Sequence, residues 1–125
     1  MADIIARYPA EASVTAYGNG GFRFADMSHK GSILCMPSGV YAWAATTVEN
    51  MTAAMLALPL SELTPPGVLL LGTGVLQAWP PEPVVKAFAN AGIGLEVMST
   101  GAAARTYNIL LAERRHVGAA LLAVP

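Results

Sequence analysis

The side chains best suited to hold a ligand lie just after two apolar runs in the second half of the chain. Gly72-Thr73-Gly74 follows the run Val68–Leu71, and Ser99-Thr100-Gly101 follows the run Leu95–Met98 and opens a helical pattern. Backbone N–H groups at the start of a helix attract anions, and hydroxyl, guanidinium and amide groups can bind the same ligand. The sequence therefore predicts a candidate binding site that consists of Gly72, Thr73, Gly74, Ser99, Thr100, Arg105 and Asn108.

Each part of this candidate site also has an ordinary structural interpretation. Gly72-Thr73-Gly74 lacks the third glycine of a dinucleotide-binding loop, because Gln77 stands in its place, so a tight turn is favoured over a nucleotide site. The pair Ser99-Thr100 is typical of a helix N-cap, and capping is compatible with anion binding. Arg105 would act as an anion clamp and Asn108 as an orienting amide, or both would support neighbouring loops; these two interpretations are equally open.

No combination of residues indicates a catalytic or metal centre. Cys35 lies in an apolar run, where a cysteine is usually an inert small hydrophobic residue. His29 falls in a polar segment, and His116 follows the last helical pattern, where it would complement the helix C-terminus as a cation. Two distant histidines and one cysteine provide no metal-ligand spacing. We therefore predict no catalytic residue, no metal site and no cofactor, and a non-enzymatic role is favoured.

The elements that would position these groups begin with a β-rich opening over residues 12–43. Its expected strands, with a polar turn at Met27–Lys30 between the second and third, are Val14–Tyr17, Phe22–Phe24, Ser32–Met36 and Val40–Trp43. Residues 46–124 then follow the order α-β-α-β-α-β, which is typical of a parallel or mixed sheet with helices packed on it. The runs Val68–Leu71 and Leu95–Met98 are predicted to be buried strands, and Ala119–Val124 the last strand. The sequence thus indicates one α/β domain over residues 1–125.

Three helices are expected between these strands. The first runs from a capping box at Thr46 and Glu49 to Leu58 and ends at Pro59. The second and third helices are Pro81–Asn90 and Gly101–Arg114. The residues of the second helix that should face the core are Val84, Val85 and Phe88. Right-handed crossovers would bring the segments after Leu71 and after Met98 to the same edge of the sheet.

The composition constrains the partners and the location of the protein. The chain is 54% hydrophobic and 12% charged with a net charge of −1, and it lacks the basic patches expected for nucleic acid or an anionic membrane. Prolines and glycines interrupt the uncharged stretches Gly31–Val48 and Leu63–Pro81, so no transmembrane segment is expected. The single cysteine and the absence of a secretory signal favour a cytoplasmic location. The low charge favours a protein partner or a homo-oligomer, with Trp79 as a candidate contact and Trp43 in the core.

A set of residues spread over nearly the whole chain is similar to a known family. It comprises Leu69–Gly74, Gly94–Met98, Arg105-Thr106-Tyr107-Asn108 and Glu113, with weaker matches at Tyr17, Gly21-Phe22, Gly31-Ser32-Ile33 and Trp43. The pattern resembles the small-domain family that includes NADH dehydrogenase (complex I) assembly factor 3 and the adipogenesis-associated protein. The resemblance implies a three-layer α/β fold with a mixed central sheet, helices and an additional N-terminal β-hairpin layer. It implies no catalytic residues, and Ser99 stands where that family commonly has an aspartate.

Two functional hypotheses follow from these observations. The resemblance, the low charge and the lack of a catalytic constellation favour a non-enzymatic interaction or assembly module. Such a module would be linked to the assembly of a membrane (respiratory) complex and would associate with it peripherally. The alternative is a small-molecule or anion-binding protein, with or without enzymatic activity, whose site lies at the carboxyl ends of the strands.

Overall fold

A mixed five-stranded sheet forms the centre of the computed structural model, which describes residues 5–125. Its strands follow the order β5-β4-β8-β6-β7. β4 (Ser32–Met36) pairs antiparallel with β5 (Gly39–Trp43) and β8 (Val117–Leu121). β6 (Val68–Gly72) pairs parallel with β8 and with β7 (Gly94–Met98). The mixed sheet is confirmed, and the parallel pairing places the carboxyl ends of β6 and β7 at the same edge.

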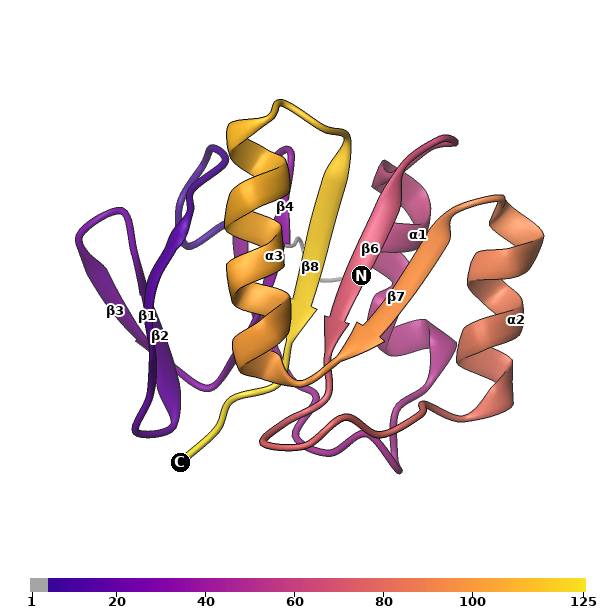
Figure 1. The fold of residues 1–125 in the computed structure, drawn as a ribbon, viewed down its shortest axis with the longest axis horizontal. Helices are drawn as coiled ribbons and strands as arrows, with labels where there is room; N and C mark the ends of the chain where they lie inside the picture. The colour runs from indigo at the N-terminus through magenta and orange to yellow at the C-terminus, as the bar shows by residue number, and fades with distance from the viewer. Residues whose placement is uncertain (1–4) are drawn as a thin grey trace.

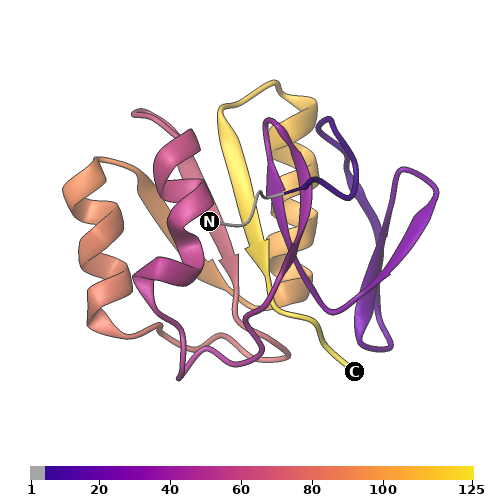
Figure 2. The same cartoon turned by 180° about the vertical axis from the view of Figure 1, so that it is seen from behind.

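Helices cover both faces of this sheet. α1 (Ala57–Glu62) and α2 (Glu82–Ala91) lie on one face, and α3 (Thr100–Ala112) lies on the other (Figures 1 and 2). Within the described residues, none of the helices combines the length and the apolarity that crossing a bilayer requires. The arrangement is the layered α/β fold that the sequence predicts.

Two apolar cores lie on the two faces of the central sheet. Leu69 and Leu71 of β6 pack with Phe88 of α2 in one core, whereas Leu70 packs with Tyr107 of α3 in the other. Successive side chains of a strand point to opposite faces, so an uninterrupted apolar run supplies both cores. The apolar run of β6 therefore fixes the strand between two helical layers.

The N-terminal strands form a separate antiparallel sheet beside α3 (Figure 1). β1 (Val14–Gly18), β2 (Gly21–Phe24) and β3 (Met27–Lys30) are joined by two-residue turns whose central residues all have positive φ, as tight hairpin turns require. Phe22 and Phe24 of β2 pack in the same core as α3. The additional β layer is thereby held against the helix by apolar contacts.

Two predicted elements in the first half of the chain are wrong. Met27–Lys30 is strand β3 and not a polar turn, because the turn that precedes it needs only two residues and its mixed burial suits an edge strand. No helix starts at Thr46. A 3-10 helix, η1 (Ala53–Leu56), begins only after Thr52, whose hydroxyl accepts a hydrogen bond from the Met55 N–H. Pro59 lies in the first turn of α1, where the missing N–H costs no helical bond.

Smaller differences concern the exposure and contacts of single residues. α2 is confirmed and ends at Gly92 in a left-handed conformation, but Val85 is exposed while Val84 and Phe88 are buried. β7 is an edge strand, so only its Val97 is buried. The Nε2 atom of His116 accepts a hydrogen bond from the Thr64 N–H (3.1 Å), so this side chain contacts the segment that precedes β6.

Candidate functional site

The edge at which β6 and β7 end brings together five of the seven residues predicted to bind a ligand. The Thr73 N–H donates to the Met98 carbonyl (2.9 Å), and the Thr100 N–H donates to the Gly74 carbonyl (2.8 Å). Ser99 caps α3, because its hydroxyl accepts a hydrogen bond from the Ala102 N–H. The predicted proximity of these two segments is therefore confirmed.

The two threonine hydroxyls at this edge are engaged by the backbone. Thr100 Oγ1 donates to the Leu122 carbonyl (2.7 Å) and accepts from the Gly74 N–H (3.0 Å). Thr73 Oγ1 accepts from the Ala78 N–H (2.9 Å) and lies 2.9 Å from the Leu76 carbonyl oxygen. Gly72 fits closely beside them, since a Cβ there would lie 2.9 Å from the Thr100 Cα. These hydrogen bonds join parts of the fold to one another, and binding of a ligand by the same groups stays a prediction.

The loop that follows β6, residues 73–81, exposes three large apolar side chains within five residues. Val75, Leu76 and Trp79 are 69%, 77% and 71% exposed. Gln77 fixes the loop between them, because its Nε2 donates to the Val97 carbonyl (2.8 Å). We refer to Val75, Leu76 and Trp79 together as the apolar loop. The Thr73 hydroxyl and the Gln77 amide of residues 73–81 are hydrogen-bonded within the protein, whereas the three side chains of the apolar loop face solvent.

Arg105 and Asn108 contact β1 and not the strand ends. Asn108 Oδ1 accepts from the Val14 N–H (2.8 Å) and its Nδ2 donates to the Val14 carbonyl (2.8 Å). Arg105 Nη1 donates to the Tyr17 hydroxyl (3.0 Å), and the Tyr17 ring packs against Gly101. These two side chains hold the small sheet to α3, which is the structural interpretation left open by the sequence. A ligand role for Arg105 and Asn108 stays a prediction.

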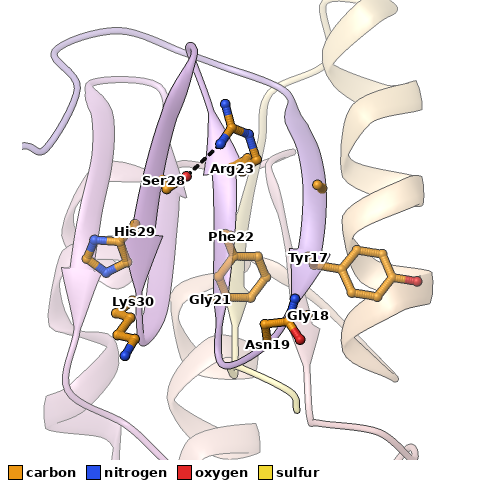
Figure 3. A pocket seen from close by; sticks show the side chains of 10 residues that line it. Tyr17, Gly18, Asn19, Gly21, Phe22, Arg23, Ser28, His29 and Lys30 are labelled. Atoms are coloured by element: carbon orange, nitrogen blue, oxygen red, sulfur yellow. Dashed lines mark hydrogen bonds between the residues drawn. The ribbon is translucent and has the colours of Figure 1, made fainter.

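A pocket of about 510 Å³ lies over the β1–β3 sheet (Figure 3). Its lining comprises Ala16, Tyr17, Gly18, Asn19, Gly21, Phe22, Arg23, Ser28, His29 and Lys30, and contains no acidic side chain. We call it the cationic pocket. Arg23 Nη1 donates to Ser28 Oγ (2.7 Å), so the guanidinium is oriented by a neutral partner. The volume lies in the range of small-molecule sites.

The cationic pocket is not predicted from the sequence, because a polar turn is expected where β3 lies. The usable signal is the two-residue spacing between Phe24 and Met27, which is typical of a hairpin, followed by a polar segment that ends in His29 and Lys30. Burial, together with the nearby charge of Arg7, lowers the pKa of His29 below its ordinary value, while a hydrogen bond from the imidazole to the Ser32 backbone opposes the shift. The neutral form of the imidazole is therefore favoured beside the pocket.

The remaining titratable groups of interest are buried and unreactive. Burial raises the pKa of the Cys35 thiol to about 12, so it is protonated at neutral pH and is a poor nucleophile. Burial likewise raises the pKa of the Tyr107 phenol, whose hydroxyl is buried without a hydrogen-bond partner in the described structure. Over residues 5–125, no cluster of three or more histidine, cysteine or carboxylate side chains could hold a metal ion.

Comparison with known proteins places the chain in a family. Residues 14–122 match the model of DUF498, described as proteins of unknown function (DUF498/DUF598). The chain belongs to this family. It is 36% identical over 112 residues to an uncharacterized protein of Rhodobacter capsulatus, covering 90% of this chain and 85% of that protein.

Two further relatives extend the comparison to a named protein and to a solved structure. NADH dehydrogenase (ubiquinone) 1 alpha subcomplex assembly factor 3 of Drosophila melanogaster is 34% identical over 114 residues, which is 87% of this chain and 57% of that protein. A crystal structure described as an outer membrane protein from Bartonella henselae is 45% identical, with a TM-score of 0.86 over 95% of this chain and 100% of that chain. The family resemblance noted from the sequence is confirmed.

Proposed function

We propose that this protein is a non-enzymatic assembly module that binds a subunit of a membrane (respiratory) complex through the apolar loop. The similarity to a complex I assembly factor supports an assembly role, although the chain spans 57% of that relative's length. The proposed location is the cytoplasm, with peripheral association at the membrane complex.

The exposure of Val75, Leu76 and Trp79 is the observation that carries the proposal. Tryptophan is among the residues that contribute most to the binding energy of protein interfaces, and the contacts around such a residue serve to exclude water. Trp79 would be the main contact, with Val75 and Leu76 beside it. The Thr73 and Gln77 hydrogen bonds hold the loop before any partner arrives, so little conformational entropy is lost on binding. An ordered apolar loop is therefore better suited to docking than a mobile one of the same composition.

The chemistry of the loop also specifies the kind of surface it fits. No charged residue occurs from Thr64 to Pro81, so the loop offers no ion pair to a partner. The complementary surface is a shallow apolar pocket on a protein, large enough to accept the Trp79 ring and lined with few charges. Insertion of the same side chains into a lipid surface is the competing outcome, because tryptophan is also favoured at membrane interfaces.

Capture of the tagged protein from its native cells tests the proposal. Wild type should recover an identified subunit of a respiratory membrane complex, and Leu76→Ser combined with Trp79→Ser should reduce that recovery at least tenfold. Ile109→Ser is the matched control, because Ile109 is also exposed (58%) but lies on α3. Equal recovery with the loop variant, or loop-dependent binding to protein-free phosphatidylcholine vesicles without recovery of a subunit, would overturn the proposal.

A further inference from the structure

The outward face of the β1–β3 sheet combines a floor of small residues with cationic walls. Cross-strand register sets Ala16, Arg23 and Ser28 side by side, and Gly18, Gly21 and Lys30 form the next row on the same face. A Cβ at Gly21 would collide with the His29 carbonyl oxygen, and Gly18 has φ +127, so the hairpin itself requires both glycines. The absence of side chains at these positions leaves space in the pocket, whose lining side chains, including Arg23 and Lys30, are drawn in Figure 3.

The charges around this hollow have one sign. Arg23 and Lys30 stand diagonally on neighbouring strands, because Arg23 pairs with Ser28 and Lys30 lies two residues further along β3. Residues in this relation are roughly 7–8 Å apart, and long side chains can bridge that separation to reach one ligand. Neither makes an ion pair within residues 5–125, and the Asp26 carboxylate at the β2–β3 turn is outside the lining. Arg7 lies close enough for its charge to act on His29. Two unneutralised cations with a neutral imidazole nearby favour a ligand with two negative charges.

We propose that the cationic pocket binds a small phosphate monoester, with Arg23 and Lys30 contacting the phosphate group and Ser28 and Asn19 supplying polar contacts at its edge. A phosphate monoester carries a charge of about −1.5 to −2 at neutral pH, and the guanidinium fork matches its oxygens in pairs. The volume of about 510 Å³ exceeds what a lone phosphate ion fills, which leaves space for the organic part of the ligand. The proposal is independent of the apolar loop, which lies after β6.

Titration of the ¹⁵N-labelled full chain with phenyl phosphate and with inorganic phosphate tests this site by NMR. We expect saturable shifts at the amides of residues 16–30, with tighter binding of the monoester, and no such shifts with chloride at matched ionic strength. Arg23→Gln and Lys30→Gln should each raise the dissociation constant at least tenfold. Lys86→Gln removes one charge from the distant helix α2 and should leave the dissociation constant unchanged.

A second variant keeps both cations and still removes the site. Ser28→Asp places a carboxylate beside the Arg23 guanidinium, where it would occupy the position of the phosphate, and it should abolish binding while the spectrum shows an intact fold. Vesicles containing phosphatidic acid, a lipid whose headgroup is a phosphate monoester, test whether the phosphate belongs to a lipid, since binding to them would require Arg23 and Lys30. The proposal is overturned if neither phosphate compound nor these vesicles bind, or if folded Ser28→Asp and Arg23→Gln bind as wild type does.

Discussion

The strand-end edge and the β1–β3 sheet differ in which side chains, polar or apolar, face solvent. At the strand ends, the hydroxyls of Thr73 and Thr100 are bound to backbone groups, and the groups left facing solvent are apolar. On the small sheet, the apolar side chains face the core, and Arg23 and Lys30 face outward without ion pairs among the described residues. The residue types that suggest a ligand site are therefore present in both regions, but of these two regions only the small sheet carries, among residues 5–125, cations that face outward without an ion pair.

This difference follows from how the backbone N–H and C=O groups of each region are hydrogen-bonded. A loop between parallel strands must satisfy its own N–H and C=O groups at a buried edge, so nearby hydroxyls are recruited for that purpose. A two-residue hairpin turn satisfies its backbone locally and leaves the outward side chains unengaged. In this protein, the threonine hydroxyls at the strand ends are consequently weaker indicators of binding than the cations on the outward face of the hairpins.

The largest expected effect is the loss of stability on replacing Thr100 by valine. Thr100→Val keeps the shape but leaves the buried Leu122 carbonyl and the Gly74 N–H without their partner, and each unpaired group costs about 1–3 kcal/mol. The free energy of unfolding, measured in urea, should fall by about 3 kcal/mol. The exposed Thr46 provides the control, since Thr46→Val should change stability little. A stable Thr100→Val protein would show that this hydroxyl is free for a ligand, and the contrast between the two regions would fail.

Local patterns predict the parts of the fold that depend on a single segment. The apolar run of β6, the α2 stop at Gly92 and the Ser99 cap of α3 all follow from short-range rules. The helix expected from Thr46 is wrong because its apolar spacing also suits an irregular segment whose Val48 and Met51 reach the core. Periodicity cannot distinguish these two ways of burying the same residues.

The candidate site could be predicted only in part. Some of its contacts follow from strand topology, whereas others join residues far apart in the sequence. The meeting of Thr73 with Thr100 follows from parallel strand topology. The contact of Asn108 with Val14 joins positions 94 residues apart, and no local pattern indicates that β1 would lie beside α3. Once the small sheet is placed there, the Arg105 guanidinium donates a hydrogen bond to the Tyr17 hydroxyl of β1.

The second largest effect should come from the attachment of the small sheet to α3. Asn108→Ala removes both hydrogen bonds to Val14, and the better helix propensity of alanine offsets part of the loss, so stability should fall by about 1.5 kcal/mol. Amide hydrogen exchange should accelerate at Val14 and its β2 partners while the β6 amides stay protected. Asn50→Ala at an exposed position is the control. Equal acceleration throughout the chain would mean that the two regions open as one unit.

A gain of stability is expected beneath the small sheet. Tyr107→Phe removes a buried hydroxyl that has no partner in the described structure. Burying an unpaired hydroxyl lowers the stability of the folded state, so the variant without it should be more stable. The free energy of unfolding, measured in urea, should therefore rise by about 1 kcal/mol. Tyr41→Phe should have the opposite sign, because the Tyr41 hydroxyl is hydrogen-bonded to Ser38. If both variants lose stability, the Tyr107 hydroxyl has a bound partner in solution and the expected gain is wrong.

A smaller effect on stability is expected for Arg105→Ala. This variant tests most directly whether Arg105 binds a ligand or supports the fold. Arg105→Ala breaks an exposed hydrogen bond to Tyr17, so stability should change by about 0.5 kcal/mol. Phenyl phosphate binding in the cationic pocket should be retained, because Arg105 does not line it. A thermal-shift screen of phosphates and carboxylates compares this variant with wild type. A ligand that stabilises wild type and not Arg105→Ala would restore the anion clamp at the start of α3.

The smallest effect is the contribution of His29 to the pH dependence of stability. Its folded-state pKa is below the ordinary value of 6.5, so the unfolded chain binds more protons as the pH falls through that range, and protonation favours unfolding. Stability from this group is complete above about pH 6.5 and is lost as the pH falls through the lowered folded value. Between about pH 8 and about pH 5.5, the urea midpoint of wild type should therefore fall relative to that of His29→Gln.

An anion in the cationic pocket would favour the charged imidazole of His29 and raise its pKa, so saturating phenyl phosphate should reduce this relative fall. A relative fall that phosphate leaves unchanged, in a protein that binds it, would place the ligand away from His29 and towards the Arg23 side of the pocket.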